Sequence, residues 1–404
     1  MGVAAKKGEK GAEAMKKHKN HHHRKARRSH IRRRTKPGAT PGSVVVDPAA
    51  RQPDLHVTLY GPSRFQEHRN VRVEDLPGLM TEEANVWVEV DGLGNGELIE
   101  RIGELFHLHR LALEDVVNSH QRAKVEPYAD FLFLVARMPK YDSPHLAERC
   151  ATEQLSMFVK PGVLVTFQEK DDDCLQPVRE RLRQGTGRIR EQGVDYLAYA
   201  LTDAAIDAFY PILEKVGERI EELEEVILTR KSSIDAFTAI REVKRELLVL
   251  RRAIWPHREM IGSLIRDPFP QITDSTRVYL RDCYDHSVQI IDLLELYRDL
   301  SSDLRDFHLS MVSNRMNEQM RVLTVVATLF MPPTFLVGLY GQNFARLPFA
   351  GEEYGYWPFF VALVLFAASS AAMMGYFWYV GWINLRGRAV RAPLAEMKAS
   401  GDST

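Results

Sequence analysis

The chain has few cysteines for its length. Cys150, Cys174 and Cys283 are the only three in 404 residues, and they lie far apart in the sequence. They are too few and too scattered to form a disulfide framework or a zinc site. The sequence therefore predicts reduced thiols in a reducing compartment.

Motifs for nucleotide binding and for catalysis are also missing. The sequence contains no phosphate-binding Gly-Lys-Ser/Thr loop, which argues against any process driven directly by ATP. An enzyme would need a nucleophile with its base or a closed metal cluster, and neither is evident in the sequence. We therefore expect that the protein is not an enzyme.

An apolar stretch is absent from the amino terminus, so we expect no cleaved signal peptide and a cytoplasmic location for the amino-terminal body. The first 40 residues hold 14 Lys or Arg against two Glu, and the remaining residues carry 40 basic and 52 acidic side chains, a net charge of minus 12. Because residues 1–42 have almost no apolar side chains, they cannot bury a core and are predicted to be a basic disordered tail.

The tail has two interpretations that the sequence leaves open. It could contact anionic lipid headgroups or nucleic acid electrostatically, or it could be solvated without a specific partner. We expect lipid as the contact, if any, and no nucleic acid partner. His18 and the run His21, His22 and His23 could chelate a transition metal. We favour no metal there, because a flexible cluster lacks supporting hydrogen bonds.

Residues 43–170 have the pattern of a cytoplasmic α/β domain. Branched and aromatic side chains predict strands at 43–46, 55–60, 85–90, 131–138, 154–159 and 163–167. Residues 97–118 have helical periodicity with an acidic carboxyl end. Asp171, Asp172 and Asp173 follow this domain, and we interpret these consecutive carboxylates as a hydrated loop rather than a metal site.

Beyond Asp171 the pattern is helical. Amphipathic helices are predicted at 195–230 and 233–265, as an antiparallel hairpin within residues 171–274. A further helix starts near Ser275 and has no Pro or Gly before Pro332. Continued to residue 341, this stalk helix would be on the order of 100 Å long.

Two uncharged segments follow, and each is long enough to cross a bilayer. The first span covers about 322–340, and the second, 357–383, has Tyr356, Trp357, Trp378 and Trp382 at its ends. Arg386, Arg388 and Arg391 come after the second span. The positive-inside rule then places the tail 384–404 in the cytoplasm and the loop 342–356 outside, so both termini are predicted inside.

The first span has two different faces. At 100° per residue, one arc of about 80° collects small, hydroxylated or soft side chains: Met320, Thr324, Ala327, Met331, Thr334 and Gly338. Such a stripe could simply let two helices pack closely. Asn317 precedes the arc, however, and Gly341, Gln342 and Asn343 end it. Amide and hydroxyl oxygens along one face suit a hydrated cation, so a pore is the better hypothesis.

These residues carry a family resemblance. The segment 317–344, NEQMRVLTVVATLFMPPTFLVGLYGQNF, resembles the pore helix and signature of the CorA magnesium channels. Agreement continues over roughly 45–385, in the motifs LEDVVNSHQRAKVE (113–126), TFQEK (166–170), PVRERLR (177–183) and RDCYDH (281–286). Two residues depart from the family pattern: Gln342 stands where Met is usual in the Gly-Met-Asn motif, and Pro333 makes a Pro-Pro pair.

The resemblance implies a funnel-shaped homopentamer in the cell membrane, with an α/β cytoplasmic domain, a long-helix stalk and two transmembrane helices. It implies Mg²⁺ influx, with Co²⁺ and Ni²⁺ as further substrates, and closure by intracellular Mg²⁺. The implied selectivity filter is Gly341, Gln342 and Asn343; the implied pore-lining residues are Asn317, Met320, Leu323, Thr324, Met331, Thr334 and Gly338. Asp115 and Asp282, with Glu114, match the family's regulatory cation site between subunits.

Two alternatives stay open. Gln342 at the middle motif position also fits a zinc-transporting relative in the same superfamily. A membrane-anchored protein that senses a cation without conducting it would satisfy the same helices and carboxylates.

Overall fold

The computed structural model describes residues 38, 40–80, 84–140, 151–170, 173–229, 233–341 and 356–382. The chain divides into two compact units, residues 1–305 and 306–404, and each is considered by itself. Several expectations lie outside the described residues: almost all of the basic tail with its histidines, Asp171 and Asp172, the loop 342–355, and the tail 384–404.

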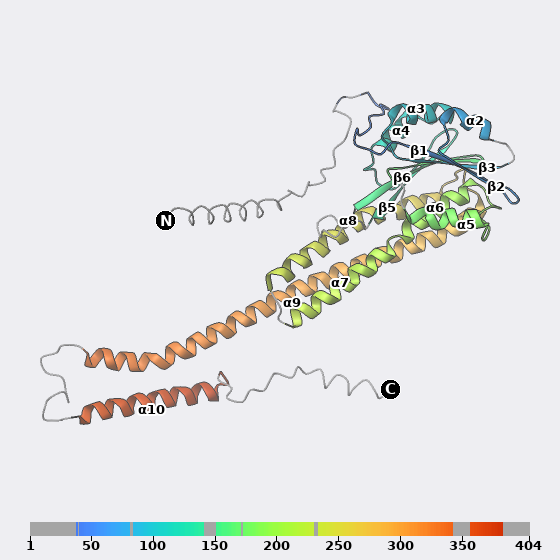
Figure 1. The fold of residues 1–404 in the computed structure, drawn as a ribbon. Helices are drawn as coiled ribbons and strands as arrows, with labels where there is room; N and C mark the ends of the chain where they lie inside the picture. The colour runs from blue at the N-terminus through green and yellow to red at the C-terminus, as the bar shows by residue number, and fades with distance from the viewer. Residues whose placement is uncertain are drawn as a thin grey trace, which may run out of the picture. The chain divides into compact units, whose positions relative to one another are not determined.

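A seven-stranded sheet is the centre of the first unit (Figure 1). The strand order is β2-β1-β3-β7-β6-β5-β4, and every neighbouring pair is antiparallel except β3 with β7. The strands are β1 (Asp54–Tyr60), β2 (Phe65–Arg69), β3 (Asn85–Asp91), β4 (Lys124–Pro127), β5 (Leu132–Lys140), β6 (Ala151–Lys160) and β7 (Val163–Gln168).

Each face of the sheet has its own apolar core. In β5, Phe133 and Val135 pack toward one face while Leu132 and Leu134 pack toward the other, as the alternation of a strand requires. The first face is covered by α3 (Gly96–Leu105) and α4 (Arg110–Val117). The second is covered by α6 (Val194–Asp207), most of whose residues are buried. Burial on both sides is worth about 1.5–3 kcal/mol for each large apolar side chain.

The sequence predicted the central strands better than the edges. Five of the six predicted strands correspond to β1, β3, β5, β6 and β7. The strand at 43–46 was wrong: Val44 and Val46 pack on the core of the first face but form no strand. The edge strands β2 and β4 were missed, because their sequences, FQEHR and KVEP, lack the apolar alternation of a strand buried on one face.

Two predicted helices are each divided in the structure. The helix at 97–118 is broken between α3 and α4, where His107 has a φ of 53°. The helix at 195–230 is broken between α6 and α7 (Tyr210–Leu228), because Pro211 has no N–H and is tolerated only in the first turn of a helix. Because of the second break, α6 ends at Asp207, whose carboxylate lies beside His286.

The first unit also contains four short helical elements and a further long helix. The short elements are η1 (Val73–Asp75), α2 (Leu76–Leu79), η2 (Asp173–Leu175) and α5 (Gln176–Gln184). Helix α8 (Ser233–Arg266) contacts α7 along the chain and also reaches β4 and β5. The predicted pairing of two long helices is therefore present, with α7 and α8 as its members.

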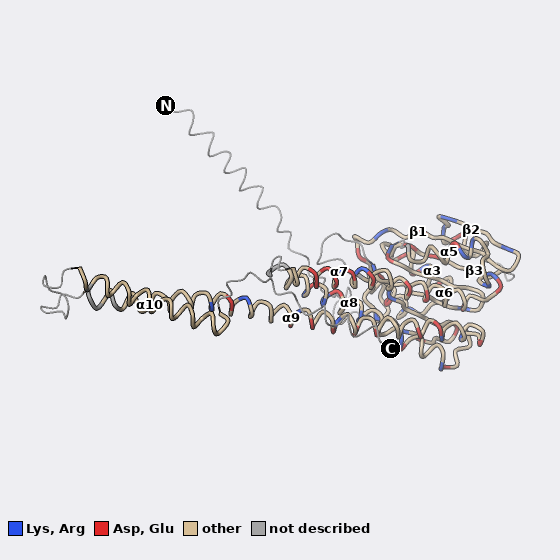
Figure 2. The backbone as a smooth tube through the Cα atoms, turned by 90° about the horizontal axis from the view of Figure 1, so that it is seen from below, with Lys and Arg blue, Asp and Glu red and all other residues tan. Residues whose placement is uncertain are grey.

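Helix α9 (Asp274–Tyr340) is continuous over 67 residues, with Pro332 and Pro333 inside it. At 1.5 Å per residue it is about 100 Å long, as the sequence predicted. In the second unit, α9 is followed by α10 (Trp357–Tyr379). Figure 2 shows charged residues along the helices of the first unit, whereas α10 and the end of α9 carry no Lys, Arg, Asp or Glu.

Among the described residues, one helix is long and apolar enough to cross a membrane, Phe359–Tyr379. It lies within the predicted second span. The predicted first span is the carboxyl-terminal part of α9, and three of its side chains, at 336, 339 and 340, lie outside those described. Many of the others are exposed apolar groups, including Val322, Phe330 and Val337.

Candidate functional site

A cluster of three metal-ligand side chains lies where α6 ends beside α9. Asp203 and Asp207 are one turn apart on α6, and His286 comes from α9. One ligand atom from each lies within 4.8 Å of the others. His286 Nδ1 is 3.7 Å from Asp203 Oδ1 and 3.6 Å from Asp207 Oδ1.

The electrostatics of the cluster favour a bound cation. Burial, then the charge of Asp207, raises the pKa of Asp203 to about 6, although nearby His286 acts in the opposite direction. Burial also raises the pKa of Asp207. Cys283, on the neighbouring turn of α9, is fully buried, and burial followed by the charges of these two carboxylates raises the pKa of its thiol. Negative charge has therefore accumulated in a partly desolvated place.

The donor atoms of the cluster fit a divalent cation. Asp203 Oδ1 and His286 Nδ1 are both buried atoms without a hydrogen-bond partner among the described residues. Buried polar atoms are normally satisfied, and these two atoms lie 3.7 Å apart, where either a proton on His286 or a shared cation would satisfy Asp203 Oδ1. Asp282, 69% exposed, lies on the other side of the imidazole, with its Oδ2 3.9 Å from His286 Nε2. Carboxylate oxygens suit Mg²⁺, and an imidazole adds affinity for Co²⁺ or Ni²⁺.

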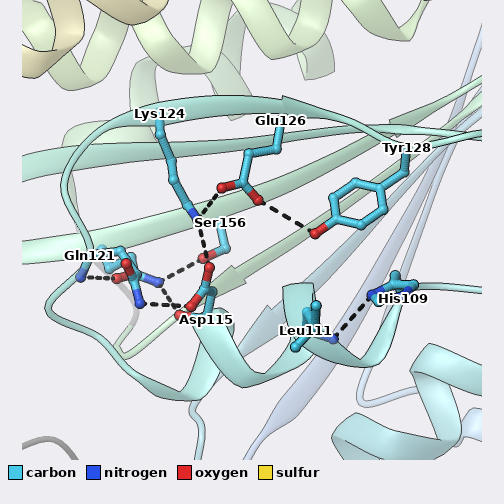
Figure 3. A network of polar contacts seen from close by, with 9 residues as sticks. His109, Leu111, Asp115, Gln121, Lys124, Glu126, Tyr128 and Ser156 are labelled. Carbon is cyan, nitrogen blue, oxygen red and sulfur yellow. Dashed lines mark hydrogen bonds and ion pairs between the residues drawn. The ribbon is translucent and has the colours of Figure 1, made fainter. Parts of the chain in front are cut away.

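Asp115, the other predicted regulatory residue, already has partners within its own chain (Figure 3). Its Oδ2 accepts from Lys124 Nζ at 2.5 Å, and its Oδ1 accepts from Gln121 Nε2 at 2.7 Å. Burial lowers the pKa of Lys124, but hydrogen bonds to Asp115 and Glu126 outweigh that effect and the net pKa is raised. A cation at Asp115 would therefore have to displace or share the ammonium group of Lys124.

Glu114 is held in a similar way: its Oε2 accepts from the backbone N–H of Gly42 at 2.7 Å. No contact joins Asp115 or Glu114 to Asp282 within the part of the chain that the structure describes. Asp282 instead lies next to the Asp203 cluster.

Sequence analysis missed that cluster, although His286 falls inside the RDCYDH motif and Asp203 and Asp207 have the one-turn spacing of a helical ligand pair.

The residues predicted to line a pore form one exposed face of α9. Met320 is 57% exposed, Leu323 63% and Met331 66%, and Asn317, Thr324, Thr334 and Gly338 are exposed as well. Thr324 and Thr334 donate their hydroxyl hydrogens to Met320 O and Phe330 O, at 2.8 and 2.7 Å. The hydroxyl oxygens thus keep their lone pairs free to accept from water.

Another face of α9 is the one covered within the chain. Val325, Thr328, Leu329 and Pro332 are less exposed than their neighbours, and Pro333 is buried. By helical arithmetic this covered face lies roughly 130° around the helix from the arc of Met320, Thr324 and Met331. At the end of α9, the N–H of Gly341 donates to Val337 O at 2.8 Å. Gln342 and Asn343 lie outside the described residues.

Comparison with known proteins agrees with the resemblance in the sequence. A family model described as CorA-like Mg²⁺ transporter protein matches residues 82–381. The chain is 39% identical over 349 residues to the cobalt/magnesium transport protein CorA of Thermotoga maritima, covering 86% of this chain and 98% of that one. It is 26% identical to the CorA protein of Methanocaldococcus jannaschii, over 64% of this chain and 80% of that protein.

The fold agrees as well. The solved CorA magnesium transporter of Methanocaldococcus jannaschii superposes with a TM-score of 0.70 at 21% identity, covering 81% of this chain and 98% of that chain. The family model covers most of the chain, and the Thermotoga protein is similar over nearly its whole length. The chain therefore belongs to the CorA-like Mg²⁺ transporter family of membrane proteins.

Proposed function

We propose that this protein is a homopentameric channel that admits Mg²⁺ to the cytoplasm, with Co²⁺ and Ni²⁺ as further substrates. The observation that carries the proposal is the arc of Met320, Thr324, Met331 and Thr334, which is exposed and lies away from the covered face of α9. A single chain with two spans cannot enclose a pore, so this arc would line one only in an oligomer. The membrane potential and the ion gradient would drive the flux.

Each predicted pore residue has a chemical role in this proposal. A ring of Asn343 carbonyl oxygens, one from each copy, would accept hydrogen bonds from the first-shell waters of a hydrated ion, and Gly341 and Gln342 would shape that ring. Thr334 and Asn317 would offer further oxygens deeper in the pore and at its inner mouth. Rings of Met320, Leu323 and Met331 would form an apolar constriction that stops ions by excluding water.

The proposed topology places both termini in the cytoplasm of a cell with the loop 342–356 outside. The candidate span Phe359–Tyr379 supports the second crossing, and the uncharged, exposed end of α9 supports the first. Lipid would contact the large apolar side chains that do not face the pore or α10.

For regulation, we propose that intracellular Mg²⁺ binds at two adjacent places, the cluster of Asp203, Asp207 and His286 and the neighbouring Asp282, and favours the closed state. Asp115 and Glu114 of a neighbouring copy would complete the site, since they do not meet Asp282 within one chain. Carboxylates from two subunits repel each other unless a cation lies between them, so loss of Mg²⁺ would release the subunits. The approach of one ligand atom each from Asp203, Asp207 and His286, within 4.8 Å of one another, supports this placement.

The test is divalent-ion flux into proteoliposomes that contain the full-length protein. We expect Mg²⁺ influx that Co²⁺ and Ni²⁺ compete for, that Mg²⁺ on the cytoplasmic side shuts, and that Asn343→Ala abolishes while the oligomer stays intact by size-exclusion chromatography. Asn317→Ala is a matched amide variant at the other mouth, and we expect it to weaken flux less.

The result also separates the alternatives. Preference for Zn²⁺ over Mg²⁺ in the same vesicles would favour the zinc-transporting relative. No current from any divalent ion would favour a membrane-anchored cation sensor, and normal flux in Asn343→Ala would remove the filter assignment.

A further inference from the structure

The end of α10 is built to fix the orientation of one aromatic ring. Gly381 has a φ of 77°, which a residue with a side chain rarely adopts. The N–H of Trp382 donates to Phe377 O at 2.8 Å, and the N–H of Gly381 donates to Trp378 O at 3.0 Å. This pair of hydrogen bonds is the Schellman motif, which normally brings an apolar contact between the residue after the glycine and the last turn.

That contact is a ring stack. Trp382 lies on Phe377 with 5.6 Å between ring centroids and 15° between planes, and Phe377 is 5% exposed. The backbone of Trp382 is therefore fixed by the helix cap, and its indole ring is fixed by the stack on Phe377. Because the Trp382 side chain is already fixed, it loses little conformational entropy when its ring binds another group.

The further group is Arg321 of α9, whose guanidinium carbon lies 5.9 Å from the centroid of the Trp382 ring. Arg321 is the last charged residue before the uncharged stretch of α9. It follows Met320, and a step of 100° turns it toward the side of α9 on which Val325 and Pro332 are covered. The cation–π contact thus keeps Arg321 away from the arc of Met320 and Thr324.

This position matters if α9 lines a cation channel, and the inference rests on that proposed function. An arginine at the inner mouth, repeated in every copy, would place a ring of positive charge beside the ions that leave the pore. We propose that Trp382 is a positioning residue that holds the Arg321 guanidinium out of the ion path. The positive charge then faces the membrane interface, where arginine and tryptophan are both favoured.

The experiment compares initial Mg²⁺ influx in proteoliposomes for the full-length wild type and four variants. Trp382→Ala releases Arg321, and we expect influx to fall about three- to tenfold. Adding Arg321→Gln to Trp382→Ala should restore influx to near the wild-type rate, because the released charge is gone. Trp382→Phe keeps an aromatic face and should retain most of the influx. Trp378→Ala is the matched control, an exposed interfacial tryptophan outside the stack.

A purely structural role for Trp382 predicts a different result, because removing the charge of Arg321 would not rescue a damaged helix end. Unchanged influx in Trp382→Ala, or reduced influx that Arg321→Gln leaves reduced, overturns the inference. If Trp382→Ala fails to assemble, Trp382→Leu keeps an apolar contact with Phe377 without the π face and carries the same test. A wild type without Mg²⁺ influx would instead contradict the proposed function, so the two failures are distinguishable.

Discussion

Among single residues, His257 shows most clearly how burial controls an ionisable group. It is fully buried on α8, and its Nε2 accepts from the backbone N–H of Arg137 in β5 at 3.0 Å. Its Nδ1 lies 2.9 Å from Ala253 O, so the proton belongs on Nδ1 in the neutral ring. Burial lowers the pKa of His257 to about 4, with the charge of Arg137 acting in the same direction.

This lowered pKa predicts acid sensitivity. The unfolded chain binds a proton at His257 near pH 6.5, whereas the folded chain does so only near pH 4. The folded state therefore gains its full stability from neutral His257 above pH 6.5. As the pH falls from 6.5 to 4, the free energy of unfolding decreases by about 3 kcal/mol in total. Hydrogen exchange of the β5 peptide that contains Arg137, corrected for intrinsic rates, should show protection falling across this range.

His257→Gln should remove much of that pH dependence, because a glutamine can accept from Arg137 N without titrating. His120→Gln, at an exposed position, is the matched control and should behave like the wild type. Hydrogen-exchange protection of the β5 peptide that does not change with pH in the wild type would contradict the lowered pKa of His257.

The Asp203 cluster leads to a second prediction, for regulation. The pKa of Asp203 is raised to about 6, so its proton competes with a cation as the pH falls through that value. The Mg²⁺ concentration needed to shut the channel should therefore rise below pH 6 in the wild type. Asp203→Asn should need more Mg²⁺ than the wild type above pH 6, where the wild-type carboxylate is ionised, and should show a weaker pH dependence. Flux assays at several cytoplasmic Mg²⁺ concentrations measure both effects.

Glu97→Gln, an exposed carboxylate on α3, is the control for the loss of one negative charge. Identical Mg²⁺ inhibition in Asp203→Asn and the wild type would show that this cluster does not regulate the channel.

At the scale of elements, the start of α9 depends on one buried carboxylate. Asp195 on α6 is 4% exposed, and its Oδ2 accepts from both the N–H and the hydroxyl of Thr273, at 2.9 and 2.7 Å. Thr273 in turn caps the helix, because its Oγ1 accepts from the N–H of Thr276. The two helices that carry the Asp203 cluster are therefore joined at this point.

Asp195→Ala should destabilise the first unit by about 1–3 kcal/mol, because it removes two hydrogen bonds from Thr273 to a buried carboxylate. Thermal unfolding of the full-length protein in detergent, followed by circular dichroism, should show a lower midpoint. Asp274→Ala, one residue beyond Thr273 with a 99% exposed side chain, should change the midpoint little. An equal drop in the unfolding midpoint of both variants would contradict the stabilising role of the contact between Asp195 and Thr273.

Elements were predictable where a local pattern decides them. Buried strands such as β5 and the unbroken α9 follow from composition and from the absence of Pro and Gly. The breaks at His107 and before Pro211 were not predicted, since the apolar periodicity continues across both. The site was only partly predictable, because the approach of Asp203 and Asp207 to His286 depends on how α6 packs against α9, which no local pattern encodes.

For the whole molecule, the sequence predicted an α/β body, a long helix and two apolar spans. The family comparison agrees with the body and the long helix, and the described residues contain one candidate span, Phe359–Tyr379. The pentamer, the filter and the closure by Mg²⁺ remain proposals, because each requires several copies of the chain or residues such as Asn343 that lie outside the described part. Helical arithmetic could find the arc of Met320, but only the structure identified the covered face of α9, because the coverage of a side chain depends on tertiary packing.

The parallel pair β3 and β7 also has a consequence for synthesis on the ribosome. Val86 lies opposite Val163, so β3 has no neighbour on that side until β7 has left the exit tunnel. The strands that follow β3, from β4 to β7, pair with one another in chain order and can form locally. A nascent chain that stalled before Gln168 would expose the apolar edge of β3, and holdase chaperones would be expected to bind it there.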